Sequence, residues 1–207
     1  MSVVLAAGGS TRMGRPKMVL PLGDRTVLAA AVQPHLDAGV GRVVVVLGDR
    51  SAEVMAKAGI TADPRLRAVV NAEWAEGMSS SIRRGLAEAA DAEAVLIALG
   101  DEPGLAAERI RRLIGAWRPG VPLVVPVQEG RAGHPVLFDR RLFGELAALT
   151  GDVGAREVVR RHWGAAATIE AGPLADLDTE ADYRAFRDGR LEAARAGLEV
   201  PRTEREV

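Results

Sequence analysis

The stretch Ser2-Val3-Val4-Leu5-Ala6-Ala7-Gly8-Gly9-Ser10-Thr11-Arg12-Met13-Gly14-Arg15-Pro16-Lys17 decides the fold. Its first six residues form a nearly continuous apolar run, which is typical of a strand buried on both faces. Three glycines then follow within seven residues, and such a loop can turn its backbone N–H groups toward phosphate oxygens. Because ligands of an open α/β sheet bind beyond the carboxyl ends of the strands, this loop predicts a phosphate-binding site.

Further β-branched runs alternate along the chain with segments of helical period, the pattern of a mostly parallel sheet covered by helices. The expected strands are Arg42–Leu47, Arg67–Val70, Ala94–Leu99 and Val121–Val125. The expected helical stripes are Val27, Leu28, Ala31 and Val32; Ile82, Leu86 and Ala89; and Ile110, Leu113, Ile114 and Trp117. The sequence therefore predicts an α/β fold, a single Rossmann-like three-layer domain.

The alternation changes after Pro126. We expect a loop at Gly130–Gly133, a short strand at Pro135–Phe138, and helices at Arg140–Leu149 and Ala155–His162. We interpret residues 127–188 as an acceptor-facing part of one domain, 1–188, whose nucleotide-binding part spans about residues 1–126. The tail, 189–207, is rich in Arg, Glu and Ala and is expected to be a frayed helix or disordered.

Composition excludes several classes of function. The chain has no cysteine, and its three histidines are too dispersed for a zinc site. A net charge of −1 with scattered basic residues does not indicate nucleic-acid binding. No signal peptide is recognisable, and no apolar run approaches the ~20 residues that span a bilayer. We therefore expect a cytoplasmic protein that binds no membrane and is a monomer or a weak dimer.

Arg12 and Lys17 add two cations to the loop, at a spacing that could hold a triphosphate. The loop is not a Walker A motif, because Gly14 is followed by Arg15-Pro16-Lys17 and not by Lys-Ser/Thr. Its glycines also do not match the dinucleotide fingerprint. The residues alone leave open a second interpretation, a structural turn with solvated Arg and Lys.

Two acidic segments could bind a metal. Asp101 ends a buried strand, and magnesium prefers carboxylates together with phosphate oxygens and water. The alternative for Asp101 is a helix cap before Pro103. Asp178 and Thr179 could likewise cap a following helix, with Asp182 in its first turn.

The segment from Leu5 to Gly14, followed by Lys17 and Leu20-Pro21-Leu22, resembles the signature loop of the MobA-like nucleotidyltransferases, most closely the molybdenum cofactor cytidylyltransferases. The resemblance extends over nearly the whole chain except the tail and implies a fold of the nucleotide-diphospho-sugar transferase type. It implies catalytic roles for Arg12, Lys17 and Asp101. It also implies nucleotide contacts from Leu5, Ala6, Ala7, Gly8, Gly9, Ser10, Arg12, Lys17 and Asp101.

The resemblance also implies a metal site. Gly100-Asp101-Glu102-Pro103 is similar to the family's Gly-Asp-x-Pro, in which the Asp binds the metal, and the acid before Thr179, Asp178, completes the site. The implied cofactor is Mg²⁺, with Mn²⁺ as an alternative, and Glu102 receives no role. Two carboxylates at one metal repel each other when no cation lies between them, so Asp101→Asn is expected to maintain or slightly raise stability without nucleotide.

Asn71 to Ser81 resembles the block that lies against the nucleobase and ribose, which implies contacts from Asn71, Gly77, Met78 and Ser80. N-capping by Ser79 or Ser80 is the simpler interpretation and is compatible with such contacts. Trp74 is expected to pack rather than stack on the base. Ala7 in Leu-Ala-Ala-Gly is similar to the pyrimidine-using branch of the family and favours CTP.

The stretches from Gly133 to Phe138 and from Leu149 to Arg156 resemble acceptor-side blocks. Arg131, His134 and Arg156 are the candidates to meet an anionic acceptor. For His134 alone, an exposed or capping role is the simpler alternative.

The resemblance implies transfer of CMP from CTP to the terminal phosphate of molybdopterin, with release of pyrophosphate. A phosphate nucleophile is already ionised near neutral pH, so alignment and charge neutralisation suffice. The alternatives are a guanylyltransferase, a sugar-phosphate nucleotidyltransferase, or a non-catalytic chaperone of a molybdoenzyme. A client molybdoenzyme is a further expected partner.

Overall fold

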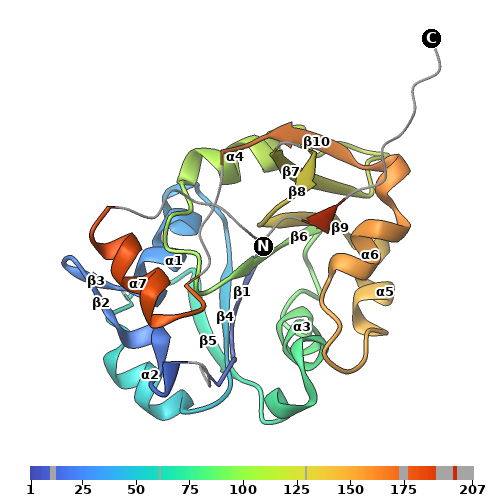
Figure 1. Ribbon diagram of the computed structural model, residues 1–207. Helices are drawn as coiled ribbons and strands as arrows, with labels where there is room; N and C mark the ends of the chain where they lie inside the picture. Colours follow the sequence, from blue (N-terminus) through green and yellow to red (C-terminus); the bar gives the residue numbers. More distant parts are fainter. Residues whose placement is uncertain (10–12, 61, 129, 173–176, 190–197, 200–207) are drawn as a thin grey trace.

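One central sheet organises the described part of the chain (Figure 1). The computed structural model describes residues 1–9, 13–60, 62–128, 130–172, 177–189 and 198–199. Ser10 and Arg12 therefore lie outside the described residues, as does most of the tail. No helix in these ranges has the length and apolar character that crossing a membrane requires.

The sheet has the strand order β5-β4-β1-β6-β9-β7-β8-β11, with β10 on the other side of β7. Its strands are β1 (Ser2–Ala6), β4 (Val43–Leu47), β5 (Leu66–Val70), β6 (Ala94–Leu99), β7 (Leu123–Gln128), β8 (Arg131–Ala132), β9 (Val136–Asp139), β10 (Ala167–Glu170) and β11 (Leu198–Glu199). β1 pairs in parallel with β4 and β6, and β4 with β5. Among the described strands of this sheet, only β8 and β9 are antiparallel to the rest.

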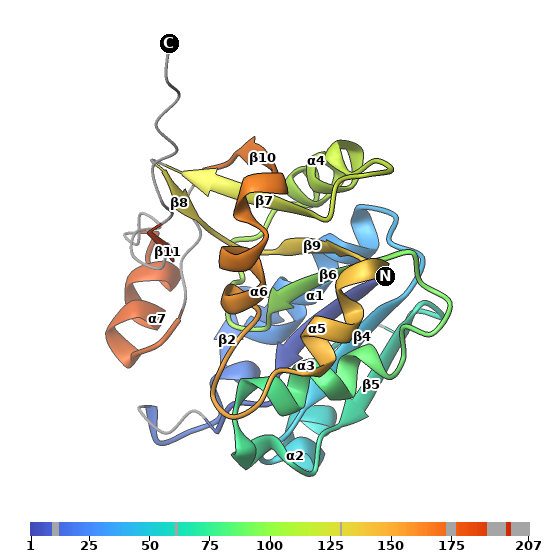
Figure 2. The same ribbon diagram turned by 90° about the vertical axis from the view of Figure 1, so that its right-hand side faces the viewer.

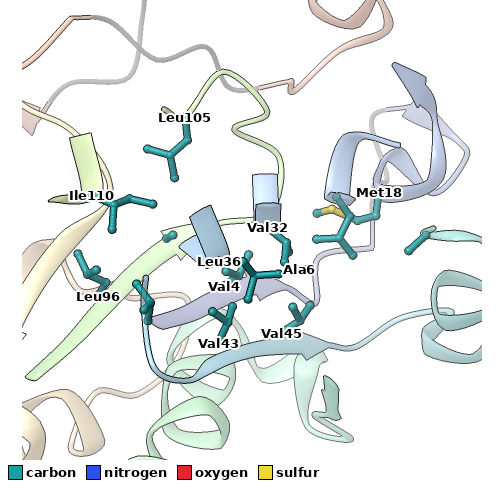
Figure 3. Packing of buried hydrophobic residues seen from close by; sticks show 14 of the residues in the cluster. Val4, Ala6, Met18, Val32, Leu36, Val43, Val45, Leu96, Leu105 and Ile110 are labelled. Atoms are coloured by element: carbon teal, nitrogen blue, oxygen red, sulfur yellow. The ribbon is translucent and has the colours of Figure 1, made fainter. Parts of the chain in front are cut away.

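Helices cover both faces of the sheet (Figures 1 and 2). One face carries α1 (Val27–Asp37), α2 (Ser51–Lys57) and α4 (Ala107–Ala116), and the other carries α3 (Met78–Leu86), α5 (Phe143–Ala147) and α6 (Arg156–Arg161). Side chains of β1 alternate between the two cores: Val4 and Ala6 pack on the α1 side, and Val3 and Leu5 on the α3 side. Figure 3 shows the first of these cores. The predicted three-layer, mostly parallel α/β domain is confirmed.

A smaller core lies beside the main domain. α7 (Glu180–Arg187) packs over the hairpin of β2 (Pro21–Leu22) and β3 (Arg25–Thr26), burying Leu177 and Tyr183 against Leu20 and Val27. The Tyr183 hydroxyl donates to the carbonyl of Pro21 at 2.5 Å. The C-terminal helix is therefore fastened to the segment that follows the glycine-rich loop.

Four expectations from the sequence differ from the structure. The loop at Gly130–Gly133 contains β8, and the helix at Arg140–Leu149 is a 3₁₀ turn (Arg140–Leu142) followed by α5. Ile114 is 40% exposed, because α4 turns only Ile110 and Leu113 fully inward. In the tail, Leu198–Glu199 form the strand β11, which pairs with β8, whereas a frayed helix or a disordered segment was expected there. Other 3₁₀ helices span Lys17–Val19, Trp74–Glu76 and Trp163–Ala165.

Candidate active site

Four parallel strands end at one edge of the sheet, and the predicted site residues follow them. Gly100 brings the end of β6 close to β1: its N–H donates to the carbonyl of Leu5 at 2.9 Å. A Cβ at this position would lie 2.9 Å from the Cβ of Ala6, so a side chain there would force the strands apart. Gly100 therefore delivers Asp101 directly beside the glycine-rich loop.

Lys17 joins the two predicted metal acids. Its Nζ donates to Oδ2 of Asp101 and lies 3.6 Å from Oδ1 of Asp178. The side chains of Lys17 and Asp101 are only 12% and 16% exposed, whereas that of Asp178 is 51% exposed. Residues far apart in sequence therefore converge on one point, with a cation of the protein itself between the two carboxylates.

Asp178 is held there by its neighbour. The N–H of Leu177 donates to the carbonyl of Asp101 at 3.2 Å, and the Leu177 side chain is fully buried in the α7 core. An ion pair between Arg15 and Glu180, at 2.7 Å, also ties the loop to α7. The docking of α7 thus places the second acid next to the first.

Helix capping does not account for either acid. The N-cap of α7 is Thr179, which accepts from the N–H of Asp182 at 3.1 Å and forms a capping box with that residue. The N-cap of α4 is Ala106, which has no capping side chain, and Asp101 lies five residues before it. The carboxylates of Asp101 and Asp178 are therefore committed to Lys17 and not to helix ends.

The donor set fits a hard divalent cation. The carboxylates of Asp101 and Asp178 both face the Lys17 ammonium. Mg²⁺ or Mn²⁺ could be bound by two such carboxylates, with phosphate oxygens and water completing its coordination shell. Within the described ranges no group of three or more His, Cys, Asp or Glu side chains could hold a metal. The expectation that Asp101→Asn maintains or raises stability was wrong in its premise, because Lys17 already separates the two negative charges.

The three glycines of the loop do not share one backbone conformation. Gly14 has φ +65°, but Gly8 and Gly9 do not adopt positive φ. Gly9 instead permits close packing, since a Cβ there would lie 3.3 Å from the Trp74 ring and 3.5 Å from the Asp49 carboxylate. Trp74 packs against the loop, as expected. Asp49, which comes shortly after β4, is a further neighbour of the loop that no sequence motif indicates.

Two of the predicted nucleotide contacts bond to each other. Asn71 is 3% exposed, and its amide donates to the hydroxyls of Ser80 at 2.8 Å and Ser81 at 3.1 Å. Ser80 in turn donates to the carbonyl of Gly77 at 2.8 Å. These polar groups are used inside the protein and shape the turn that leads into α3.

The N-terminus of α3 is capped from a distant loop. Its N-cap is Gly77, at φ +109°, and not Ser79 or Ser80. The N–H of Met78 donates to Oδ1 of Asp152 at 3.3 Å, and a Cβ on Gly77 would lie 2.6 Å from the Asp152 backbone. The segment predicted to lie against the nucleobase therefore contacts the loop predicted to lie on the acceptor side.

A small cleft joins the two halves of the site. Its wall combines Leu5 and Met78 with His134 and Arg156, so it brings predicted nucleotide contacts next to predicted acceptor contacts. Met78 is 41% exposed there. Arg131 does not line this cleft, because its strand neighbour Ala132 does and successive side chains point to opposite faces.

Behind the cleft lies a group of charges that the sequence had not indicated. Glu102 is 2% exposed, and its Oε1 lies 3.2 Å from Nδ1 of His134. Arg109, on α4, donates to the carbonyl of His134 at 3.3 Å and also contacts the carbonyl of Gly172. Burial lowers the pKa of Arg109, and the charge of Glu102 partly opposes this effect.

Comparisons with known proteins identify three curated relatives that match most of the chain. The chain is 38% identical over 172 residues to nicotine blue oxidoreductase of Paenarthrobacter nicotinovorans, covering 77% of this chain and 80% of that protein. It is 31% identical to the purine catabolism protein PucB of Bacillus subtilis, covering 90% and 95%. It is 25% identical to the molybdenum cofactor cytidylyltransferase of Escherichia coli, covering 87% and 92%.

Solved structures are similar over almost the whole chain. Rv0371c of Mycobacterium tuberculosis has a TM-score of 0.77 at 34% identity, with 90% of this chain and 96% of that chain covered. Its manganese complex has a TM-score of 0.74 at 33% identity, with 90% and 97% covered. A nucleotidyl transferase from Methanothermobacter has a TM-score of 0.76 at 27% identity, with 93% and 98% covered.

The family model named MobA-like NTP transferase domain matches residues 2–167. This range contains the glycine-rich loop, Lys17, Asp101 and the cleft, while Asp178 follows it. The resemblance seen in the sequence is confirmed, and the chain belongs to the MobA-like NTP transferase domain family.

Proposed function

We propose that this chain transfers CMP from CTP to the terminal phosphate of molybdopterin and releases pyrophosphate. The observation that carries the proposal is the convergence of Asp101 and Asp178 on one cation beside the glycine-rich loop. A site that binds a triphosphate through a divalent metal needs such a pair of carboxylates together with basic side chains.

Asp101 and Asp178 would hold the metal, Mg²⁺ or Mn²⁺. A divalent ion bound there supplies positive charge to the phosphate oxygens and to the leaving pyrophosphate. Related Rv0371c has been crystallised with manganese, which supports the use of a divalent ion in this family. Asp101, which is the more buried of the two acids, is the stronger determinant of metal position.

The loop residues bind the nucleotide. Backbone groups from Leu5 to Gly9 face the phosphates, and Lys17 leaves the carboxylates to contact the β- or γ-phosphate when the metal–nucleotide complex binds. Arg12 is assigned the same task, although it lies outside the described residues. These cations align the α-phosphorus for in-line attack and neutralise the charge that develops on pyrophosphate.

His134 and Arg156 bind the acceptor; both line the cleft together with Met78, a predicted nucleotide contact. Arg156 is suited to the acceptor phosphate, because guanidinium groups bind phosphate oxygens bidentately. The preference for CTP over GTP rests on Ala7 in the signature loop and on the similarity to a cytidylyltransferase.

A second candidate function is a redox reaction. It is favoured by the 38% identity with a protein named nicotine blue oxidoreductase, the highest among the relatives given above. The paired carboxylates and Lys17 favour nucleotidyl transfer instead, since hydride transfer to an organic substrate has no use for two metal-binding acids.

Pyrophosphate release tests the proposal. The purified chain is incubated with Mg²⁺ and each of CTP, GTP, UTP and ATP, in the presence of molybdopterin, a sugar phosphate or no acceptor. We expect release with CTP and molybdopterin, and a larger kcat/KM for CTP than for GTP. Release with GTP alone would indicate a guanylyltransferase, and release with a sugar phosphate alone would indicate a sugar-phosphate enzyme.

A parallel reaction with NADH and nicotine blue decides the second candidate. NADH oxidation without pyrophosphate release in any combination would replace the proposed transfer by a redox function. Binding of CTP without either reaction would favour the non-catalytic chaperone.

A further inference from the structure

Arg15 is a basic residue beside the glycine-rich loop for which the proposed mechanism has no role. Its Nη2 donates to both carboxylate oxygens of Glu180, at 2.9 and 2.7 Å. Its guanidinium carbon also lies 5.9 Å from the centre of the Tyr183 ring, within the range of cation–π attraction. Because Glu180 and Tyr183 both belong to α7, Arg15 joins the segment that carries Lys17 to the C-terminal helix.

Two ion pairs connect these two segments. Arg15 pairs with Glu180 at 2.7 Å, and Nζ of Lys17 lies 3.6 Å from Oδ1 of Asp178. In each segment the two charged residues are separated by one position, and they pair in opposite order along the chain. Each segment is therefore held to the other at two points.

Asp178 and Glu180 belong to one turn whose neighbouring residues are fixed. Leu177, which precedes Asp178, is fully buried in the small core that α7 forms with the β2–β3 hairpin. Thr179, which lies between the two acids, is the N-cap of α7 and forms its capping box. Because this turn is held as a unit, a contact that fixes Glu180 also fixes the position of Asp178.

The two ion pairs differ in what happens to them in the proposed reaction, on which this inference rests. A metal that enters between the carboxylates displaces the Lys17 ammonium, so the pair of Lys17 with Asp178 is lost when Asp178 becomes a ligand. Arg15 has no second task in that reaction. Its pair with Glu180 therefore persists at the step that removes the other one.

We propose that Arg15 is a positioning residue of the metal site: through Glu180 it keeps Asp178 beside Asp101 after the Lys17 ammonium has left. Arg15 acts in this way on the geometry of the site and contributes no ligand to the metal.

The sign of one measurement separates positioning from a simple effect of charge. A positive charge near a cation site repels the cation, so loss of the Arg15 charge alone would tighten the binding of Mn²⁺. Loss of a residue that holds Asp178 in place would weaken it. A contribution to stability alone would lower Tm and leave the affinity for Mn²⁺ unaltered.

Calorimetric titration of the full chain with Mn²⁺, without nucleotide or acceptor, measures this sign. We expect Arg15→Met to raise the Kd for Mn²⁺ about threefold to fivefold, which corresponds to the ~0.6–1 kcal/mol that a good exposed ion pair contributes. The variant should fold, because the Arg15 side chain is 50% exposed and surface substitutions change stability little. Arg15→Lys, which keeps a cation for Glu180, should recover part of the affinity.

Arg184→Met is the matched control. Arg184 also pairs with Glu180, at 3.1 Å, but it belongs to α7 itself. The variant removes the same charge from the same carboxylate without cutting the link between α7 and the loop. We expect its Kd for Mn²⁺ to stay within about twofold of the wild-type value.

Asp178→Asn tests whether Arg15 acts through Asp178. Adding Arg15→Met to Asp178→Asn should weaken Mn²⁺ binding no further, because the carboxylate that Arg15 positions is already absent. A further loss as large as that in Arg15→Met alone would overturn the proposal. An unchanged or lower Kd in Arg15→Met, or an equal loss in Arg184→Met, would do the same.

These titrations do not depend on the transfer reaction. If the chain binds Mn²⁺ but releases no pyrophosphate, the proposed function is refuted, and the comparison of Arg15→Met with wild type still decides the role of Arg15. A wild-type chain that binds no Mn²⁺ would refute the metal site and the role of Arg15 together.

Discussion

Lys17→Met separates two roles of one lysine. In the structure the Lys17 ammonium neutralises Asp101 and Asp178, and in the proposed reaction it binds phosphate. Removing the ammonium takes away the positive charge that lies between these two carboxylates. We therefore expect the variant to lose stability and turnover, and at the same time to bind a divalent metal more tightly in the absence of nucleotide.

The magnitudes follow from the burial of the two contacts. The pair with Asp101 is mostly buried and resembles a charge-assisted hydrogen bond worth ~1.5–3 kcal/mol. The pair with Asp178, at 3.6 Å, is half exposed and adds little. We expect the free energy of unfolding to fall by about 2 kcal/mol, which is roughly 4–8 °C in Tm for a chain of this size. Mn²⁺ affinity should rise about tenfold, corresponding to ~1.4 kcal/mol of removed repulsion.

Calorimetric titration with Mn²⁺ and thermal unfolding, each without nucleotide, measure both effects. The other lysine of the chain, Lys57, is the control, because it pairs with Glu53 at 3.0 Å with 63% of its side chain exposed. Lys57→Met should change stability by no more than ~0.5 kcal/mol and metal affinity not at all. If Mn²⁺ bound Lys17→Met no more tightly than wild type, Asp101 and Asp178 would not be the metal ligands.

Three further predictions concern the packing, the buried histidine and the second acid. Gly85→Ala should lower the free energy of unfolding by ~1–3 kcal/mol, because its Cβ would lie 2.3 Å from a Val3 methyl group. Gly115→Ala, which has open space around it, should raise that free energy by up to ~1 kcal/mol. Urea unfolding that ranks the two variants the other way would refute this packing. Burial lowers the pKa of His35 to about 4, so its contribution to stability is complete above ~6.5 and is lost as pH falls toward 4. Between pH 6.5 and pH 4, the free energy of unfolding of the wild type should therefore fall by about 3 kcal/mol relative to that of His35→Gln. A difference between the two proteins that stays constant with pH in urea titrations would contradict this. Thr179→Ala should lower the free energy of unfolding by ~1 kcal/mol, because the helix loses its N-cap. Asp178→Asn should reduce turnover and leave Tm nearly unchanged. Normal turnover in Asp178→Asn would show that Asp178 is not a metal ligand.

The position of Asp101 could be predicted from the sequence for a physical reason. A buried apolar strand that ends in Gly-Asp must deliver the acid to the edge where parallel strands end, and the glycine-rich loop follows another strand at that edge. The same reasoning could not reveal that Asp178 also lies beside Lys17. The position of Asp178 depends on the docking of α7, which buries the neighbouring Leu177 against Leu20 and Val27.

The nucleobase block shows where residue type alone is insufficient. Asn71 and Ser80 are polar residues in a loop beside the site, but their hydrogen-bonding groups are used by each other. A sequence indicates which donors are near a ligand, and only the structure shows which are already bonded. Glu102 is the opposite case, since a charge that resemblance left without a role is buried against His134.

Short strands escaped prediction because two residues carry no periodicity. β8 spans Arg131–Ala132, and only its pairing with β7 reveals that Arg131 turns away from the cleft. Such short strands follow from the partners that the sheet provides.

Transfer of the α-phosphate label measures whether the chain moves CMP to molybdopterin. CTP labelled with ³²P at the α-phosphate is incubated with Mg²⁺, molybdopterin and either wild type or Asp101→Asn, and both labelled product and pyrophosphate are measured. We expect label on molybdopterin, one pyrophosphate per labelled product, and a transfer rate lower by orders of magnitude in Asp101→Asn. Label that appears only as free CMP, or equal transfer by the Asp101→Asn variant, would contradict it.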